Sequence, residues 1–323
     1  METKDLIVNE DGYTEFMNTT VARWLAESVH HATFKSFDGT TLSYFYAIPK
    51  EHKANIQMFH GFSEGFPRYH EMAYYFYSQG YAFFFLEMRG HGYSERFIDN
   101  EDYVYIEDYD KYVEDEKAFY DRIVRDKLYR KPLYLFSFSM GGAVAALFIE
   151  KYPEAFRKAV MTSPMLEVKT GSIPWPLVHA VMFYAKRRRM MKTPGPGQHP
   201  FDTEHDDYNR DRAISKSRYD YVRGYQVLDH HYRTCCATYA WMDASFKADK
   251  KLMRHAKEIQ TPILLFSAGA DELVEPKAHE EFARKAQNVQ LVRYDDSHHE
   301  IFSDKYETRL DFYTRIFDFI SEP

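Results

Sequence analysis

The sequence predicts an α/β fold, in which helices cover both faces of a mostly parallel β-sheet and a cap is inserted into the chain. Short apolar segments bounded by turn residues alternate with longer amphipathic stretches, as in βαβ units. Hydrophobic residues make up 45% of the 323-residue chain, which is enough to build a large core. The alternation is interrupted once, so one domain with an insertion fits this length as well as two domains do.

Eight short apolar segments are the predicted strands. The first two flank the turn residues Asp38 and Gly39 and should form a hairpin. The later segments are apolar almost throughout, as strands covered on both faces must be. In chain order the eight segments are residues 32–37, 42–47, 56–59, 82–86, 133–136, 159–162, 263–266 and 289–294.

Amphipathic stretches between the strands predict helices at residues 68–79, 112–127, 141–151, 278–286 and 308–319. Gly80 should end the first helix, because glycine adopts the left-handed conformation at no steric cost. The strand and helix alternation stops after Thr162 and resumes near Ile263. We therefore predict a first core part at residues 1–164, a cap at 165–245 and a second core part at 246–323.

Charge and composition argue against several classes of function. The net charge of -7 disfavours a nucleic-acid partner, which requires a basic surface. The chain has no apolar run of about 18 residues, and its first residues lack the pattern of a signal peptide. Its two cysteines, Cys235 and Cys236, are neighbours and a poor candidate for a structural disulfide. We expect a cytoplasmic protein and leave its oligomeric state open.

Ser139 is the candidate nucleophile. The strand at 133–136 runs through small residues into the helix at 141–151, and a sharp strand-to-helix turn of this kind presents a serine hydroxyl clear of the backbone. The usual G-x-S-x-G pattern reads S-x-S-x-G here, with Ser137 at the first position. The alternative interpretation makes Ser139 an ordinary small residue at a packed junction.

Two glycine turns follow the third and fourth predicted strands. The first turn contains His60 and Gly61, and the backbone N–H groups of Phe62 and Met140 are the candidate donors to an oxyanion. The alternative is that His-Gly is only a turn dipeptide. The second turn, residues 89–94, carries an arginine and a histidine to which we assign structural roles.

The ordered motifs resemble the lysophospholipase L2 and monoacylglycerol lipase group of α/β-hydrolases. The matching motifs are residues 60–64, 68–69, 80–82, 89–94 and 139–142, and the resemblance spans roughly residues 30–320. It implies the α/β-hydrolase fold, with an eight-stranded, mostly parallel sheet and a lid inserted after the sixth strand. The chain departs from the family pattern at Ser137, and at Glu87, where aspartate is usual.

The resemblance also implies the acid and the base. Asp271 matches the family's acid in the pattern G-x-D-x-x-V-x-P, with Glu272 as its nearest competitor. His299 is favoured over His298 because the family's histidine is followed directly by glutamate, here Glu300. In the triad, the acid would hold the imidazole in the correct tautomer while the histidine takes the serine proton.

The cap contains a helix-like apolar run followed by a basic cluster at residues 186–189. This pattern fits a lid that contacts a membrane surface transiently, and it fits equally a cap helix packed on the core. The apolar residues of this part could line a tunnel above the serine and bind an acyl chain. They are Trp175, Val178, Val181, Met182 and Phe183.

The resemblance implies an esterase that forms an acyl-serine intermediate on a lipid ester with one acyl chain, a lysophospholipid or a monoacylglycerol. The same fold and triad would also serve a carboxylesterase or an aminopeptidase acting on small substrates, and a non-catalytic ligand-binding protein is the remaining alternative. We expect no metal and no cofactor. The polar group His199, Asp202, His205 and Asp206 is interpreted as solvated rather than metal-ligating.

Overall fold

In the computed structural model, which describes residues 2–170, 173–206, 208 and 215–322, eight strands form one sheet in the order β1-β2-β4-β3-β6-β7-β9-β10. Strand β2 is antiparallel to β1 and β4, and all other neighbours are parallel. The strands are β1 (His30–Lys35), β2 (Thr41–Ala47), β3 (Ala54–Phe59), β4 (Tyr81–Leu86), β6 (Leu133–Phe138), β7 (Ala159–Thr162), β9 (Ile263–Ala268) and β10 (Val289–Tyr294). The predicted eight-stranded, mostly parallel sheet is confirmed.

Strand β3 begins two residues before the predicted segment because a buried polar residue belongs to it. Asn55 is fully buried, and its side-chain amide donates hydrogen bonds to the carbonyls of Leu128 and Pro132, at 3.2 and 3.3 Å. A buried polar group is tolerated where such partners satisfy it. The hydropathy pattern alone therefore placed the start of this strand too late.

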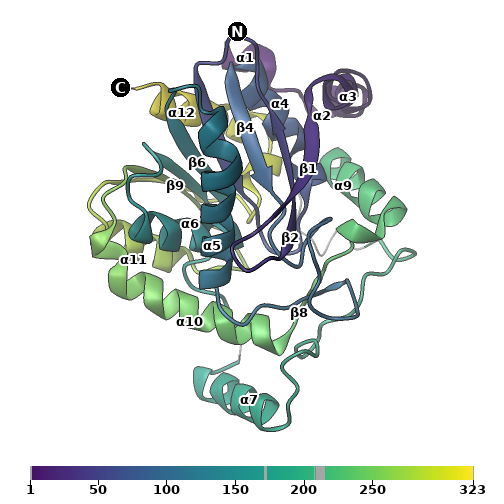
Figure 1. Cartoon of the computed structure of the whole chain (residues 1–323), viewed down its shortest axis with the longest axis vertical. Helices are drawn as coiled ribbons and strands as arrows, with labels where there is room; N and C mark the ends of the chain where they lie inside the picture. Colours follow the sequence, from purple (N-terminus) through teal and green to yellow (C-terminus); the bar gives the residue numbers. More distant parts are fainter. Residues whose placement is uncertain (1, 171–172, 207, 209–214, 323) are drawn as a thin grey trace.

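Helices cover both faces of the sheet (Figure 1). They are α1 (Thr3–Leu6), α2 (Glu10–Phe16), α3 (Ala22–Ser28), α4 (His70–Ser78), α5 (Asp110–Phe119), α6 (Met140–Lys151), α7 (Trp175–Arg187), α9 (Lys216–Leu228), α10 (Tyr239–His255), α11 (Pro276–Lys285) and α12 (Tyr306–Ser321). The five helices predicted from periodicity correspond to α4, α5, α6, α11 and α12. As expected, Gly80 follows α4 in the left-handed conformation, with φ of 81°.

The sheet separates two apolar cores, and β4 shows why its strands are apolar on both faces. Ala82, Phe84 and Leu86 belong to one core, which α5, α6, α10 and α11 complete. Phe83 and Phe85 belong to the other, which α1 to α4 and α12 complete. Successive side chains of a strand point to opposite faces, so a strand between two helical layers is mostly apolar on both faces.

Between β7 and β9 the chain leaves the sheet and forms α7, α9 and α10. Figure 1 shows α7 beyond α10, on the side away from the sheet. Helix α10 packs against α6, and its Trp241 and Ala244 belong to the first core. The predicted cap boundary at residue 245 therefore falls inside a helix whose apolar face is part of the core. A short parallel pair, β5 (Tyr103–Val104) with β8 (Cys236–Ala237), also ties this region to the core.

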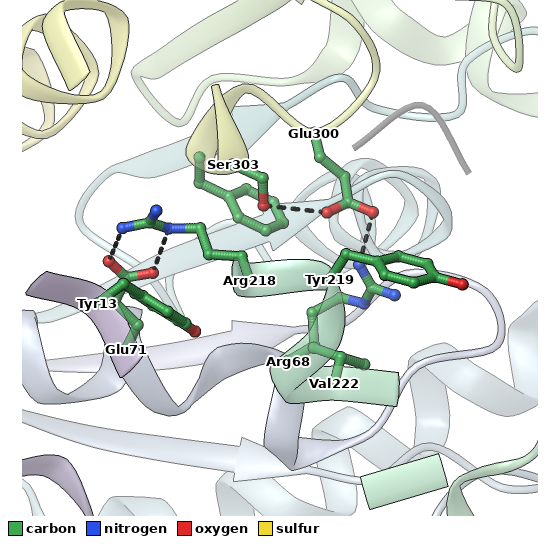
Figure 2. Close-up of a pocket in the computed structure, with 9 residues that line it drawn as sticks. Tyr13, Arg68, Glu71, Arg218, Tyr219, Val222, Glu300 and Ser303 are labelled. Atoms are coloured by element: carbon green, nitrogen blue, oxygen red, sulfur yellow. Dashed lines mark hydrogen bonds and ion pairs between the residues drawn. The ribbon is translucent and has the colours of Figure 1, made fainter. Parts of the chain in front are cut away.

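The N-terminal helices, which the sequence pattern did not predict, hold α9 in place. The guanidinium of Arg218 in α9 donates to both carboxylate oxygens of Glu71 in α4, at 2.8 and 2.6 Å (Figure 2), and to Glu10 in α2 at 3.0 Å. It also lies over the ring of Tyr13, 4.3 Å from its centre.

Among the described helices, none is long and apolar enough to cross a membrane.

Candidate active site

Ser139 lies at the turn between β6 and α6, with φ of 50° and ψ of -117°. A positive φ strains a non-glycine residue by about 1–3 kcal/mol, and such strain is typical of functional turns. The two following glycines allow α6 to approach its neighbours closely. A Cβ atom on Gly141 would lie 2.2 Å from the carbonyl oxygen of Phe59, and one on Gly142 would lie 2.4 Å from Pro164.

Ser137, where the usual motif has glycine, is fully buried in β6. Its hydroxyl donates a hydrogen bond to the carbonyl of Val160 in β7, at 3.2 Å. The side chain thus joins two strands of the sheet. Serine satisfies this position because its single polar group has a partner inside the sheet.

The structure brings Ser139, His299 and Asp271 together from three segments of the chain. The Ser139 hydroxyl lies 2.8 Å from His299 Nε2, and His299 Nδ1 lies 2.6 Å from Asp271 Oδ2. Asp271 follows β9 and His299 follows β10, so both lie near the carboxyl ends of parallel strands, where ligands bind in open α/β sheets.

Asp271 is held as an ionised acceptor. Its other carboxylate oxygen accepts the backbone N–H groups of Leu273 and Val274, at 2.8 and 3.1 Å. Burial alone would raise the pKa of Asp271, but the hydrogen bonds from His299 and from these amides lower it below its usual value. An ionised Asp271 fixes the hydrogen of His299 on Nδ1, which leaves Nε2 free to accept a proton from Ser139.

The competing residues lie beside this arrangement. Glu272 is exposed, whereas Asp271 is buried. His298 lines the cavity next to Ser139, but the hydrogen bonds to Ser139 and Asp271 are made by His299.

The turn after β3 is fixed by buried polar side chains. The His60 ring donates to the carbonyl of Gly61 at 2.7 Å and accepts the N–H of Met88 at 2.9 Å. Burial lowers the pKa of His60 to about 4, so the ring is neutral and can do both. Within the described residues, the backbone N–H groups of Phe62 and Met140 have no acceptor.

Arg89 and His91, to which we assign structural roles, are both buried in the second glycine turn, and His91 Nδ1 lies 3.2 Å from the carbonyl oxygen of Arg89. The Arg89 guanidinium makes two hydrogen bonds to the buried carboxylate of Asp115, at 2.5 and 2.7 Å. Glu87 accepts the N–H groups of Tyr93 at 2.7 Å and Phe66 at 3.3 Å. Glutamate fits here in place of the usual aspartate because residue 92 is glycine: a Cβ there would lie 2.1 Å from the Glu87 carboxyl carbon.

A cavity of about 850 Å³ opens beside Ser139. Its wall mixes apolar and polar side chains, including Phe62, Phe138, Arg68 and Glu300. The remaining wall comes from α9 and from segments without a regular pattern in the sequence. They are residues 63–64, 197–202, 205, 234–235, 272–273 and 298–299, with Tyr219, Val222, Arg223 and Gln226 of α9.

The residues predicted to form an acyl tunnel lie elsewhere. None of Trp175, Val178, Val181, Met182 and Phe183 lines this cavity. The Trp175 ring packs edge-on against Phe246 of α10 at 5.2 Å, and Met182 is buried against Tyr239, with Val178 and Val181 beside them. Phe183 points to solvent, with 70% of its surface exposed. The apolar side of α7 is thus used to pack on α10, which is why it does not reach Ser139.

The polar group at the cap divides between cavity and surface. His199, Asp202 and His205 line the cavity, and Asp202 caps the turn by accepting the N–H groups of Glu204 and His205. Asp206 is exposed and accepts the N–H of Tyr208. Cys235 and Cys236 are free thiols, with their sulfur atoms 3.6 Å apart.

The sheet order, the strained serine after β6 and its hydrogen-bonded histidine and aspartate define an α/β-hydrolase. The family model described as serine aminopeptidase, S33, matches residues 50–306. The chain belongs to this family.

Known proteins of similar sequence include lysophospholipase L2 of Escherichia coli, 24% identical over 290 residues, which cover 87% of this chain and 82% of that protein. Human monoglyceride lipase is 26% identical over 262 residues, covering 76% of this chain and 75% of that protein. Among solved structures, a carboxyl esterase from Bacillus coagulans has a TM-score of 0.72 at 17% identity, with coverage of 91% and 98%. The monoglyceride lipase from Saccharomyces cerevisiae has a TM-score of 0.70 at 16% identity, with coverage of 90% and 94%. The structural likenesses establish the fold.

Proposed function

We propose that this protein is a serine esterase that hydrolyses lipid esters with a single acyl chain, a lysophospholipid or a monoacylglycerol. The observation that carries the proposal is the chain of hydrogen bonds from Ser139 through His299 to Asp271 at the edge of an 850 Å³ cavity. The relatives named lysophospholipase L2 and monoglyceride lipase support this substrate class.

In the proposed reaction, His299 Nε2 takes the proton of Ser139 while the serine oxygen attacks the ester carbonyl. The N–H groups of Phe62 and Met140 donate to the oxyanion that forms. His299 then gives its proton to the leaving alcohol, which leaves an acyl-serine. Water, deprotonated by the same imidazole, attacks the acyl-serine; the bond to the serine oxygen breaks, His299 returns the proton to Ser139, and the fatty acid is released.

The cavity suits an amphipathic ester. Its volume falls within the usual range for small-molecule sites, about 300–1,000 Å³. Phe62, Phe138, Phe201, Val222 and Leu273 offer apolar surface to an acyl chain. The same wall carries charged and hydroxyl side chains that could bind a polar head group. We therefore assign substrate binding to this cavity rather than to the apolar residues of α7.

An aminopeptidase or a small-ester carboxylesterase is the competing proposal, and the family's description favours the former. A peptidase of this kind needs a carboxylate to bind the substrate's amine. Four carboxylates line the cavity wall, Glu64, Asp202, Glu272 and Glu300, and Arg68 pairs with Glu64 and Glu300. Arg68 compensates only part of this negative charge, so the wall alone does not exclude an amine. We favour the ester because the similar proteins named lysophospholipase L2 and monoglyceride lipase support ester substrates.

We also propose that the segment between β7 and α10 acts as the cap and that α7 contacts anionic membrane surfaces transiently. Leu177, Phe183 and Tyr184 are 54%, 70% and 57% exposed. The basic run at 186–189 follows directly on the same helix end. Exposed apolar side chains next to basic ones are typical of interfacial helices.

The decisive experiment is covalent labelling with a fluorophosphonate, followed by an ester panel. Ser139→Ala should abolish both labelling and hydrolysis while the circular dichroism spectrum stays unchanged, because losing one hydroxyl leaves no large cavity. Ser137→Ala is the matched control and should still be labelled. Labelling that persists in Ser139→Ala would reject the nucleophile, and hydrolysis of aminoacyl anilides but not esters would favour the aminopeptidase.

A further inference from the structure

We propose that Arg68 is a positioning residue. By binding both Glu300 and Glu64, it would hold the loop that carries His299 in a fixed position relative to the turn at residues 60–62, called the oxyanion turn below. The inference rests on the proposed function, since it assigns a role relative to the proposed base and oxyanion donors. Arg68 lies in the short helix Phe66–Tyr69, a few residues after the oxyanion turn.

One guanidinium bridges two carboxylates from distant parts of the chain. Arg68 Nε lies 3.1 Å from Glu64 Oε1, and its Nη1 lies 2.5 Å from Glu300 Oε1 (Figure 2 shows the bond to Glu300). The three side chains are only 23%, 5% and 17% exposed. Charge pairs withdrawn from solvent in this way are screened much less than surface pairs.

On the oxyanion side, Glu64 binds the turn itself. Its Oε2 accepts the N–H of Gly61 at 2.7 Å and the hydroxyl of Tyr69 at 2.5 Å. Gly61 directly precedes Phe62, whose amide is the proposed oxyanion donor. Burial raises the pKa of Glu64 to about 7, and Arg68 opposes that rise, so the arginine favours the ionised form that accepts the Gly61 hydrogen bond.

On the histidine side, Glu300 is the residue directly after His299. Its Oε1 binds Arg68 and its Oε2 accepts the hydroxyl of Ser303 at 3.1 Å, which Figure 2 also shows. The carbonyl of His299 accepts the hydroxyl of Ser163 at 2.7 Å. Glu300 and Ser163 therefore fix the backbone directly after the imidazole, and Arg68 connects that anchor to the oxyanion turn.

This arrangement gives a physical reason for two features of the sequence motifs. Glu300 directly follows His299, and Arg68 lies four residues after Glu64. Neither Arg68 nor Glu300 needs to touch the reacting atoms for this role. Catalysis depends steeply on alignment: a misplacement of 1 Å costs roughly 100-fold in rate. A link between the loop of the base and the loop of the oxyanion donor should therefore affect the chemical step.

The test compares Arg68→Met, Arg68→Lys, Glu300→Gln and the double variant Arg68→Met/Glu300→Gln in the full chain. We expect each neutralised single variant to lower kcat and the rate of fluorophosphonate labelling roughly 10- to 100-fold. KM for a short glycerol ester should stay within about twofold, since the proposed role acts through His299 and the oxyanion turn rather than through contact with the substrate. The double variant should be no slower than the slower single variant, because both changes break one link. Arg68→Lys should recover part of the rate.

Arg315→Met is the control, since Arg315 is an exposed arginine paired with Asp311 on α12. Multiplied losses in the double variant, or a change confined to KM, would overturn the proposal and make Arg68 a substrate contact. If Arg68→Met does not fold, the comparison of Glu300→Gln with unaltered protein decides, and an unchanged labelling rate rejects the role. Failure of the proposed function is distinguishable from failure of this inference. In the first case the unaltered protein itself neither hydrolyses esters nor is labelled at Ser139.

Discussion

The hydrogen bond between His299 and Asp271 selects one of two adjacent histidines. Consecutive residues of a loop point in different directions, so His298 and His299 cannot both face Ser139. The His299 ring spans the 2.8 Å bond to Ser139 and the 2.6 Å bond to Asp271. This choice depended on one neighbouring residue in the sequence, Glu300, and the geometry gives Glu300 a physical reason to be there through Arg68.

We expect His299→Ala to lower kcat by several orders of magnitude and His298→Ala to lower it less than tenfold, because a single imidazole serves as general base. Steady-state hydrolysis of a short glycerol ester measures both. The two variants differ in one adjacent residue, so each is the other's control. Equal losses, or a larger loss for His298→Ala, would contradict the assignment.

Asp38 provides a pH-dependent contribution to stability. Burial would raise its pKa, but hydrogen bonds from Arg89 and Thr40 outweigh burial and lower it from 3.8 to about 2. A carboxyl whose pKa is lower in the folded state stabilises the fold above its unfolded value, and this contribution disappears as the pH falls through the folded value. The stabilisation is therefore present above pH 3.8 and is lost towards pH 2.

Asp38→Asn should consequently lower the free energy of unfolding by about 1 kcal/mol at pH 7, a value reduced because the side chain is partly exposed. The difference from the unaltered protein should narrow as the pH falls from 4 to 3. Urea unfolding at pH 7, 4 and 3 measures this. Asp126→Asn, at an exposed carboxylate, is the control. A difference that is the same at all three pH values would show that the ionic charge contributes nothing.

Among the elements, α7 was predicted correctly as a helix, but the prediction that its apolar side chains line the substrate cavity was wrong. Its helical pattern could be recognised in the sequence, but the choice of partner for its apolar side could not. That side packs on α10, where Met182 meets Tyr239. Helix α9 was not predicted at all, since it is polar over most of its length and depends on the buried contact of Arg218 with Glu71, 147 residues away.

If α7 contacts membranes, the double change Leu177→Ser/Tyr184→Ser should weaken sedimentation with vesicles containing phosphatidylglycerol several-fold, because the lost apolar surface contributes about 25 cal/mol per Å². Hydrolysis of a water-soluble short ester should be unaffected, since neither residue lines the cavity. Tyr129→Ser removes an aromatic ring that is 65% exposed in the turn before β6 and serves as the control. Equal vesicle binding by the unaltered protein, the double variant and Tyr129→Ser would reject the contact between α7 and the membrane.

At the scale of the whole molecule, the sheet could be predicted because its central strands are local apolar runs and because β1 and β2 flank the turn residues Asp38 and Gly39. The turn at Ser139 could be predicted because strand, small residues and helix are contiguous. The acid and the base required the family resemblance, since Asp271 lies 132 positions after Ser139 in the sequence. The cavity wall could not be predicted: residues 197–202 and α9 lie there through tertiary contacts that leave no periodic pattern.

The volume of the cavity makes acyl-chain length the most informative property of the substrate to vary. Each methylene withdrawn from water contributes about 0.8 kcal/mol, which is roughly a fourfold gain in kcat/KM. We therefore expect kcat/KM to rise from acetyl to octanoyl esters and to level off once the cavity of about 850 Å³ is filled. The measurement compares acetyl, octanoyl and palmitoyl esters of glycerol and of glycerophosphocholine below their critical micelle concentrations, or in a fixed detergent where these are too low.

Chain length should matter more than head group, because the cavity wall carries both acidic and basic side chains rather than a cluster of one charge. Leu273→Ser tests the effect of chain length within one protein. The side chain of Leu273 offers apolar surface on the cavity wall, and its backbone N–H, which the substitution keeps, donates to Asp271. The variant should lose activity on octanoyl esters more than on acetyl esters. A kcat/KM that falls steadily from acetyl to palmitoyl would instead favour the small-ester carboxylesterase. In that case the site would offer no apolar surface on which added methylenes could be buried.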